Sequence, residues 1–318
     1  MKLLYTIIVV KIDKGGKGMV LKIHNVTKQF GNFTAVDQLS LNIPEKEMFG
    51  FLGANGAGKT TTFRMILGIL KPSSGTITWD EKNIDYSTSP IIGYLPEERG
   101  LYPKLKVRDQ MVYLARLRGM AKKDALRELD YWLSRFKVPE YADKKVEELS
   151  KGNQQKIQFI ASVIHKPKLL ILDEPFSGLD PVNVEQLKAA VLELKNNGTT
   201  IVFSSHRMEH VEEMCEHLCI MHKGKTVVQG GLRDIKRAYG KKNLVIHADF
   251  NLEELRSFPG VTDAKLTAEG ISLQIQDEEV TAPRILNSIS DKGFITKFVL
   301  EEPSLNDIFI EKVGASYE

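Results

Sequence analysis

Residues 53–61 read GANGAGKTT and place three glycines, a lysine and two hydroxyl side chains at fixed spacing. Gly53, Gly58, Lys59 and Thr60 satisfy the pattern G-x-x-x-x-G-K-[ST]. Glycines let backbone N–H groups converge on phosphate oxygens, and the start of a following helix adds partial positive charge. A lysine here reaches the β- and γ-phosphates, and the next hydroxyl holds Mg²⁺. The stretch therefore predicts a nucleoside triphosphate site.

The residues on either side of this loop fit the same interpretation. Apolar FGFL at 49–52 favours a strand before the loop, and TTFRMILGIL at 61–70 has helical spacing after it. Lys71-Pro72 then ends the helical stretch. An ordinary glycine turn is the alternative, but a turn does not require a lysine followed by hydroxyls.

Two adjacent carboxylates, Asp173 and Glu174, end the apolar run LLILDEP at 169–175. Ligands of nucleotide-binding sheets lie at the carboxyl ends of strands. One such carboxylate can hold Mg²⁺ through water, and the next can orient or deprotonate an attacking water. An acidic pair on the surface is the alternative. Beside the phosphate loop, the pair supplies the complementary half of one site.

A second anion-seeking stretch is LSKGNQQK at 149–156. Ser150 can cap the helix that NQQKIQFIASVI predicts, and the start of a helix attracts anions. One chain with one phosphate loop does not need two such helix starts on one nucleotide. Two chains arranged head to tail would use both.

These stretches together resemble the motifs of ATP-binding-cassette (ABC) proteins, over roughly residues 20–240. Ser150 and Gly152 match the LSGGQ loop of that family, while Lys151 and Asn153 depart from it. The resemblance implies that ATP lies between Lys59 of one subunit and Ser150 of another. FSGLDP then matches the family's D-loop, with Asp180 near the dimer seam, and SSH at 204–206 matches the switch histidine, His206.

The resemblance also assigns roles by residue. The expected catalytic residues are Glu174 and His206. The Mg²⁺ ligands are expected to be Thr60 and Asp173. Phe30 in KQFG occupies the place of an aromatic that stacks on adenine, with a core residue as the alternative. The residues expected to bind nucleotide are Phe30, Gly53, Asn55, Gly56, Gly58, Lys59, Thr60 and Thr61, with Ser150 and Gly152 reaching the partner subunit's ATP.

Glu97 is a departure from the family pattern. In IIGYLPEERGLY it stands where the family has a glutamine that touches Mg²⁺ and water. A carboxylate would repel the γ-phosphate unless Mg²⁺ lay between them. We therefore expect Glu97 to act, if at all, as a further Mg²⁺ ligand.

The alternation of apolar strands with helical stretches predicts an α/β fold with a mostly parallel, covered sheet. We expect a P-loop NTPase core at 19–240, with an antiparallel β part and a helical subdomain at about 98–165. After about residue 241, LVIHADF, VTDAKL, GISLQIQ and ITKFVL read as strands, and NLEELRSF and APRILNSISDKG read as helices. Residues 241–318 are therefore expected to form a small C-terminal α/β domain.

Residues 1–18 are expected to be an N-terminal extension. Their apolar stretch, Leu3–Val10, is too short for a membrane span, and no cleavage site follows it. Either they add an edge strand and a linker, or translation begins at Met19; we favour the second. A net charge of +3 gives no argument for nucleic acid as a partner, and two cysteines imply no disulfide framework.

The function predicted from the resemblance is that of the ATP-hydrolysing subunit of an ABC transporter. LPEERGLYPKLKV and EPSLNDIFIEKVG look most like the exporter branch that includes sodium- and drug-efflux systems. The expected partners are a separate multi-span permease and a second copy or a paralogous ATPase subunit, at the cytoplasmic face of the membrane. The alternative is a non-transport ABC ATPase of DNA repair or translation. No sustained heptad run lies between the phosphate loop and residue 149, and the chain has one phosphate loop.

Overall fold

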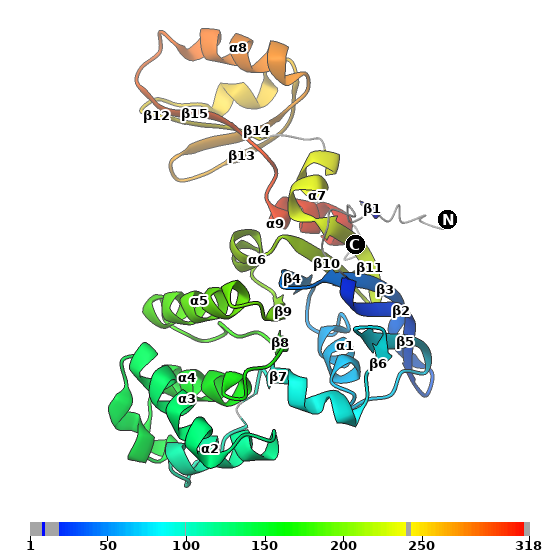
Figure 1. Cartoon of the computed structure of the whole chain (residues 1–318). Helices are drawn as coiled ribbons and strands as arrows, with labels where there is room; N and C mark the ends of the chain where they lie inside the picture. Colours follow the sequence, from blue (N-terminus) through cyan, green and yellow to red (C-terminus); the bar gives the residue numbers. More distant parts are fainter. Residues whose placement is uncertain (1–7, 10–18, 99, 240–242, 315–318) are drawn as a thin grey trace. The chain divides into compact units, whose positions relative to one another are not determined.

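The computed structural model describes residues 8–9, 19–98, 100–239 and 243–314, which form two compact units (Figure 1). The break falls between Leu232 and Arg233, at the start of helix α7 (Leu232–Tyr239). Each unit has its own apolar core. Among the described residues, no helix combines the length and the hydrophobicity that a membrane span requires.

The larger unit is built on a mostly parallel sheet. In the described part of the chain its strand order is β1-β11-β10-β4-β9-β8-β7, and only the β10–β11 pair is antiparallel. β4, β8 and β9 are buried along their whole length, which explains the unbroken apolar sequences of β4 and β8 and the apolar centre of β9 at 201–203. The strands of this sheet are β1 (Ile8–Val9), β4 (Met48–Leu52), β7 (Ile92–Leu95), β8 (Leu169–Leu172), β9 (Thr200–Ser205), β10 (His217–His222) and β11 (Lys225–Gly231).

Part of the N-terminal extension joins this sheet. Ile8 and Val9 pair in parallel with Val228 and Gln229 of β11. This pairing agrees with the edge-strand alternative for residues 1–18, and the favoured start of translation at Met19 stays a prediction. Residues 1–7 and 10–18 lie outside the described residues.

A second, antiparallel sheet covers one face of the main sheet, with helix α1 (Lys59–Ile66) between them. Its order is β3-β2-β5-β6, and its inward residues share one core with Phe49 and Phe51 of β4. Phe51 packs edge-on against Phe63 of α1. α1 is shorter than its apolar sequence predicts, because the amides of Ile69 and Leu70 turn back to the carbonyl of Arg64. The strands are β2 (Met19–Phe30), β3 (Phe33–Pro44), β5 (Ser74–Trp79) and β6 (Lys82–Asn83).

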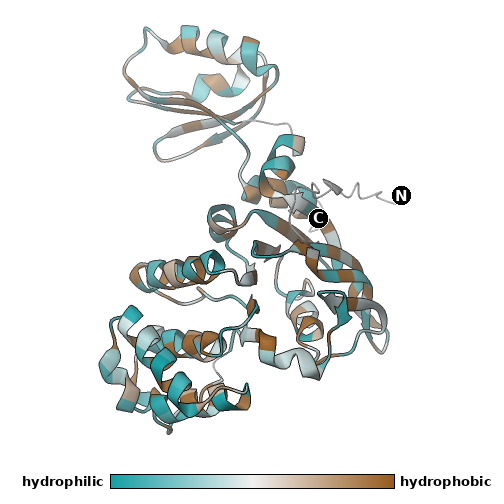
Figure 2. Ribbon diagram, viewed as in Figure 1, coloured by the Kyte–Doolittle hydropathy of each residue, from teal (hydrophilic) through white to brown (hydrophobic). Residues whose placement is uncertain are grey.

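Residues 107–163 form the expected helical part. α2 (Val107–Leu117), α3 (Lys122–Arg135) and α4 (Lys151–Val163) bury one face each, with Trp132, Phe136 and Phe159 packed as an aromatic cluster. Short helices η1 (Tyr86–Ile91), η2 (Pro139–Asp143) and η3 (Val146–Glu148) connect these elements to their neighbours. α5 (Pro181–Asn196) and α6 (Met208–Met214) follow β8 and β9. α5 shows alternating teal and brown turns, as expected of a helix with one buried face (Figure 2).

The smaller unit has the order β-α-β-β-α-β, with an antiparallel sheet β13-β14-β12-β15, as in ferredoxin-like folds. Leu244, Ile246, Ile271 and Leu273 of the sheet are fully buried in its core. NLEELRSF is a short 3₁₀ helix and not the α-helix its sequence suggested. The elements are β12 (Asn243–Ala248), η4 (Glu253–Ser257), β13 (Val261–Leu266), β14 (Gly270–Ile275), α8 (Glu278–Ile289), β15 (Ile295–Glu301), α9 (Leu305–Phe309) and the π-helical turn η5 (Ile310–Gly314).

Candidate active site

The phosphate-loop sequence connects β4 to α1 and has the backbone of an anion cradle. Gly58 precedes the helix with φ 105°, and a Cβ there would lie 2.6 Å from the carbonyl oxygen of Ala35. A Cβ on Gly56, at φ 80°, would meet no atom within 4 Å. A side chain is therefore excluded at Gly58 by strain and by crowding, whereas at Gly56 the space beside the backbone is open. This is the local geometry that lets amides approach a phosphate.

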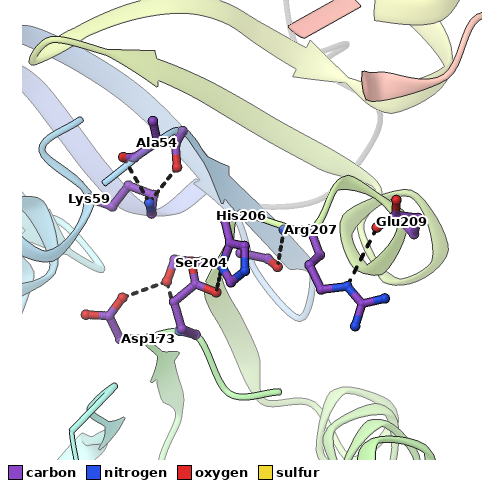
Figure 3. Close-up of polar contacts among 10 residues, drawn as sticks. Ala54, Lys59, Asp173, Ser204, His206, Arg207 and Glu209 are labelled. Carbon is purple, nitrogen blue, oxygen red and sulfur yellow. Dashed lines mark hydrogen bonds and ion pairs between the residues drawn. The ribbon is translucent and has the colours of Figure 1, made fainter. Parts of the chain in front are cut away.

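Lys59 is the first residue of α1 and is almost fully buried. Its ammonium donates to the carbonyl oxygen of Gly53 at 2.6 Å and to that of Ala54 at 3.4 Å (Figure 3). Burial lowers the pKa of the Lys59 ammonium, and three nearby carboxylates partly offset that effect. The Lys59 ammonium is thus held at the loop by neutral carbonyl oxygens. An anionic ligand could replace these oxygens as the acceptor of its hydrogen bonds.

Asp173 accepts hydrogen bonds through its carboxylate from hydroxyl groups of two neighbouring elements. Its side chain is buried just beyond β8; it accepts a hydrogen bond from Thr60 Oγ1 at 2.9 Å and another from Ser204 Oγ at 2.6 Å. Thr60 belongs to α1 and Ser204 to β9, so the contacts join the carboxyl ends of β4, β8 and β9 at one edge of the sheet. Thr60 and Asp173 were expected from the sequence to be ligands of one Mg²⁺ ion, which agrees with their proximity, and no role was expected for Ser204.

Glu174 pairs with His206, a contact that the sequence did not predict although both residues were expected to be catalytic. One carboxylate oxygen, Oε2, lies 2.8 Å from His206 Nδ1, and the backbone N–H donates to Ser204 Oγ at 3.0 Å. The other oxygen, Oε1, is buried and has no hydrogen-bond partner among the described residues. Glu174 has φ 50°, a left-handed conformation that is rare for a side chain of this kind. A buried, unpartnered carboxylate oxygen beside a phosphate loop can accept a proton from a bound water.

A cavity of about 290 Å³ brings most of these residues together. Its lining includes Glu97, whose side chain is exposed just beyond β7. The lining residues are Phe33, Ala35, Ala54, Asn55, Gly56, Ala57, Gly58, Lys59, Thr60, Thr61, Glu97, Asp173 and Glu174. Glycines, a lysine, hydroxyls and carboxylates thus surround one space, as a metal-assisted phosphoryl site requires.

Phe30 is not among the residues that line this cavity, whereas Phe33 is. The two rings pair across the β2–β3 hairpin and are 49% and 64% exposed, respectively. The ammonium of Lys28 lies 5.1 Å from the centre of the Phe30 ring. The core alternative for Phe30 is therefore wrong, and Phe33 is a second aromatic candidate that the motif did not indicate.

Ser150 and Gly152 lie outside the lining of the same cavity. Ser150 caps α4 by accepting from the N–H of Asn153 at 3.4 Å. A Cβ on Gly152 would lie 2.6 Å from Asn183 Nδ2 at the start of α5, so the glycine allows the two helix starts to meet. Asp180 caps α5 through the N–H of Asn183 at 3.0 Å. Asn183, which has no place in the motif, therefore links the 149–156 stretch to the D-loop.

Two protein-family models match the sequence of this chain. Residues 36–177 match the family model described as ABC transporter, and residues 230–313 match the model of the C-terminal domain of DrrA1-3-like ATP-binding proteins. An uncharacterized ABC transporter ATP-binding protein of Bacillus subtilis, YhaQ, is 64% identical over 299 residues, which are 94% of this chain and 100% of that protein. The bacitracin transport ATP-binding protein BcrA of Bacillus licheniformis is 30% identical, over 93% of this chain and 97% of that protein.

Solved structures agree with the sequence relatives. A structure titled as the ATP-binding subunit of an ABC transporter has a TM-score of 0.65 and 28% identity, and the match covers 70% of this chain and 93% of that one. A cbiO1 structure from Clostridium perfringens, titled as part of an ABC transporter complex, has a TM-score of 0.61 at 28% identity. With its phosphate loop, paired carboxylates and helical part in the family's order, this chain belongs to the ATP-hydrolysing ATP-binding proteins of ABC transporters.

Proposed function

We propose that this chain powers an exporter by hydrolysing Mg²⁺-bound ATP at the interface of two ATPase subunits. The observation that carries the proposal is the single cavity shared by the phosphate loop, Asp173 and Glu174. Export is supported by the names of full-length relatives, such as bacitracin transport protein BcrA and linearmycin resistance protein LnrL of Bacillus subtilis, which is 30% identical over 93% of this chain. We assign ATP binding and hydrolysis to the domain at residues 19–240, and a separate role to the small domain at residues 241–318.

The nucleotide is held by the loop and the start of α1. The backbone of Gly53–Gly58, including Asn55 and Gly56, faces the phosphates, and the hydroxyls of Thr60 and Thr61 lie on the same side, in the cavity lining. Lys59 exchanges the carbonyls of Gly53 and Ala54 for phosphate oxygens, which restores a charged partner to a buried cation. Phe30 is proposed to stack on the adenine, with Phe33 as its rival.

The oxygens around Asp173 fit Mg²⁺. A threonine hydroxyl and a carboxylate lie 2.9 Å apart, and a second carboxylate, Glu97, lines the same cavity. Hard oxygen donors of this kind suit Mg²⁺, which binds through one or two carboxylates together with substrate phosphates. When bound, the ion would neutralise charge that develops on the phosphate oxygens. Thr60 and Asp173 would hold it, and Glu97 would contact it without opposing the γ-phosphate directly.

Hydrolysis is assigned to Glu174 and His206. The carboxylate of Glu174 lines the cavity and is assigned to accept the proton of the attacking water, with Oε1 as the acceptor because it has no hydrogen-bond partner among the described residues. His206 fixes the opposite oxygen at 2.8 Å and so orients the carboxylate. Ser204 links the Asp173 carboxylate to the backbone N–H of Glu174, and so joins the side chain of one residue to the main chain of the next.

A membrane permease is the proposed partner that receives this energy. A second cavity, of about 430 Å³, has a mixed lining, in which the highly exposed side chains of Ile69 and Leu117 occur together with polar residues such as Arg118. Its wall also contains Tyr94 and Pro96, in the segment that leads to Glu97. A short apolar helix of a permease would bury these side chains and touch the segment that carries Glu97. The chain would then work at the cytoplasmic face of the membrane, without nucleic acid as a partner.

The proposal is tested by one substitution in two assays. Glu174→Gln should lower ATP turnover by about 10²–10⁴-fold while ATP still binds, because the phosphate loop is untouched. Glu140→Gln, the same change at an exposed site in η2, is the control. In inside-out vesicles that contain the permease partner together with this chain, Glu174→Gln should also stop ATP-driven movement of cargo into the vesicles. Undiminished hydrolysis would refute the role of Glu174, and hydrolysis without any transport would refute the exporter.

A further inference from the structure

Helix α4 presents two buried glutamines to the loops that carry the site's carboxylates. Gln155 Nε2 donates to the carbonyl oxygen of Pro175 at 3.2 Å, directly after Glu174. Gln158 Nε2 donates to the carbonyl oxygens of Glu98 at 2.9 Å and Pro96 at 3.3 Å, on either side of Glu97. Residues three apart share one face of a helix, so one side of α4 reaches both loops.

The contacts of Gln158 are specific in geometry. The side chain is 4% exposed, so its amide does not exchange these partners for water. A reversed amide would place an oxygen against two carbonyl oxygens, so the observed orientation is the one in which Nε2 has its two acceptors, while Oε1 is buried without a hydrogen-bond partner among the described residues. Both acceptors are backbone atoms, so the bonds fix the course of the chain through residue 97 and leave the Glu97 side chain exposed and in the cavity lining.

We propose that Gln158 is a positioning residue that holds Glu97 at the Mg²⁺ side of the cavity. The inference rests on the proposed role of Glu97 as a Mg²⁺ ligand. Ser150 caps the start of α4, so the helix that would face a partner's nucleotide also contains Gln158, which holds the backbone around Glu97. A shift of α4 would move residue 97 with it, while Gln155 would move the backbone after Glu174.

Removal of this tie should change the dependence of hydrolysis on Mg²⁺. Gln158→Met keeps the approximate size of the side chain and removes both N–H donors. A net hydrogen bond contributes about 1 kcal/mol, and about 1.4 kcal/mol is a tenfold change in an equilibrium. We therefore expect the Mg²⁺ concentration for half-maximal ATPase activity to rise roughly three- to tenfold. The two carbonyls lose their partner, and Glu97 becomes free to leave the cavity.

The test is a double-mutant cycle between Gln158→Met and Glu97→Gln, read as half-saturating Mg²⁺ and as turnover. Thermal melting of each variant reports its folding, and Gln158→Asn replaces Gln158→Met if the latter does not fold. Gln110→Met is the matched control: this buried glutamine also donates to two carbonyls, those of Tyr102 and Leu105, within the helical part. It should lower the melting temperature without changing the Mg²⁺ dependence.

Each outcome of the double-mutant cycle either supports or overturns the proposed role of Gln158. An effect of Gln158→Met that disappears in the Glu97→Gln background supports positioning through Glu97. An equal effect in both backgrounds, or no effect in either, overturns it. If Glu97→Gln alone leaves the Mg²⁺ dependence unchanged, Glu97 is not a Mg²⁺ ligand. The inference about Gln158 then fails because its premise fails, and any effect of Gln158→Met arises through another residue.

Discussion

The carboxylate of Glu174 uses its two oxygens differently. Oε2 is held by His206 at 2.8 Å, while Oε1 is buried without a partner at the cavity. A buried carboxylate oxygen left unpaired is costly, so it marks a place where a further group belongs. We propose that this group is the attacking water, so that the oxygen left unpaired in the resting protein is the one used in the reaction.

The adenine contact provides the sharpest residue-scale prediction. Phe30→Ala should weaken ATP binding roughly tenfold, because stacking on an aromatic ring contributes about 1–3 kcal/mol per base. Inhibition of the ATPase by tripolyphosphate, which has no base, should not change. Equilibrium binding of ATP to Phe30→Ala and to Phe33→Ala makes the comparison. A loss confined to Phe33→Ala would assign the base to the ring that lines the cavity and end the assignment to Phe30.

At the residue scale, fixed spacing and chain order predicted the groups that meet at the sheet edge. Lys59, Thr60, Asp173 and Glu174 are neighbours because parallel strands end together, which a motif can encode. Phe33, Ser204 and Asn183 could not be predicted in this way. Phe33 reaches the cavity through the register of a hairpin, and Asn183 meets Gly152 through the packing of two helices that are distant in sequence.

Helix α4 shows what an element adds to its residues. Ser150 caps its first turn. Two glutamines in its middle bond to the loops that contain Glu174 and Glu97, and its last residues line the second cavity. The sequence predicted the start of this helix from a serine and its amphipathic spacing. It could not predict the glutamine contacts, since a buried glutamine and a solvated one look alike until the neighbouring loops are placed.

The end of the same element should make stability depend on pH. His165 follows α4; its Nε2 lies 3.1 Å from the carbonyl oxygen of Ile92, and its Nδ1 is buried without a hydrogen-bond partner in the part of the chain that the structure describes. Burial lowers the pKa of His165 from 6.5 to about 4. The unfolded chain therefore binds a proton near pH 6.5 while the folded chain does not. The stabilisation is complete above pH 6.5 and is lost as the pH falls toward 4, by about 1.4 kcal/mol per pKa unit at most.

Urea unfolding of the intact chain at pH 7.5, 5.5 and 4.5 measures this effect. His165→Gln keeps an N–H donor for Ile92 and cannot titrate, so its free energy of unfolding should fall less between these pH values. His24→Gln, at an exposed position of β2, serves as the control. Parallel pH curves for His165→Gln and the unaltered protein would show that His165 is not the group responsible.

At the scale of the molecule, the chain joins an ATPase unit to a small ferredoxin-like unit with its own core. The change of texture near residue 241 indicated a second α/β domain, but the break at Leu232–Arg233 falls inside a helix-forming stretch that continues the earlier pattern. Composition can indicate that a new core begins. It cannot indicate which unit will hold a connecting helix, because that depends on which core the helix contacts.

The last prediction concerns two copies of the molecule. Ser150 and Gly152 lie outside the lining of the chain's own cavity, so their anion-seeking helix start is available to a second chain. Glu174→Gln should bind ATP without hydrolysing it, and the γ-phosphate should then hold two chains head to tail. Gel filtration of Glu174→Gln should show a dimer with ATP and a monomer with ADP. Adding Ser150→Arg should abolish the dimer, because the cap is lost and a bulky cation occupies the helix start. Adding Ser290→Arg, the same change at an exposed site at the end of α8, should leave it intact. A dimer that persists with Ser150→Arg would mean that the chains associate through another surface.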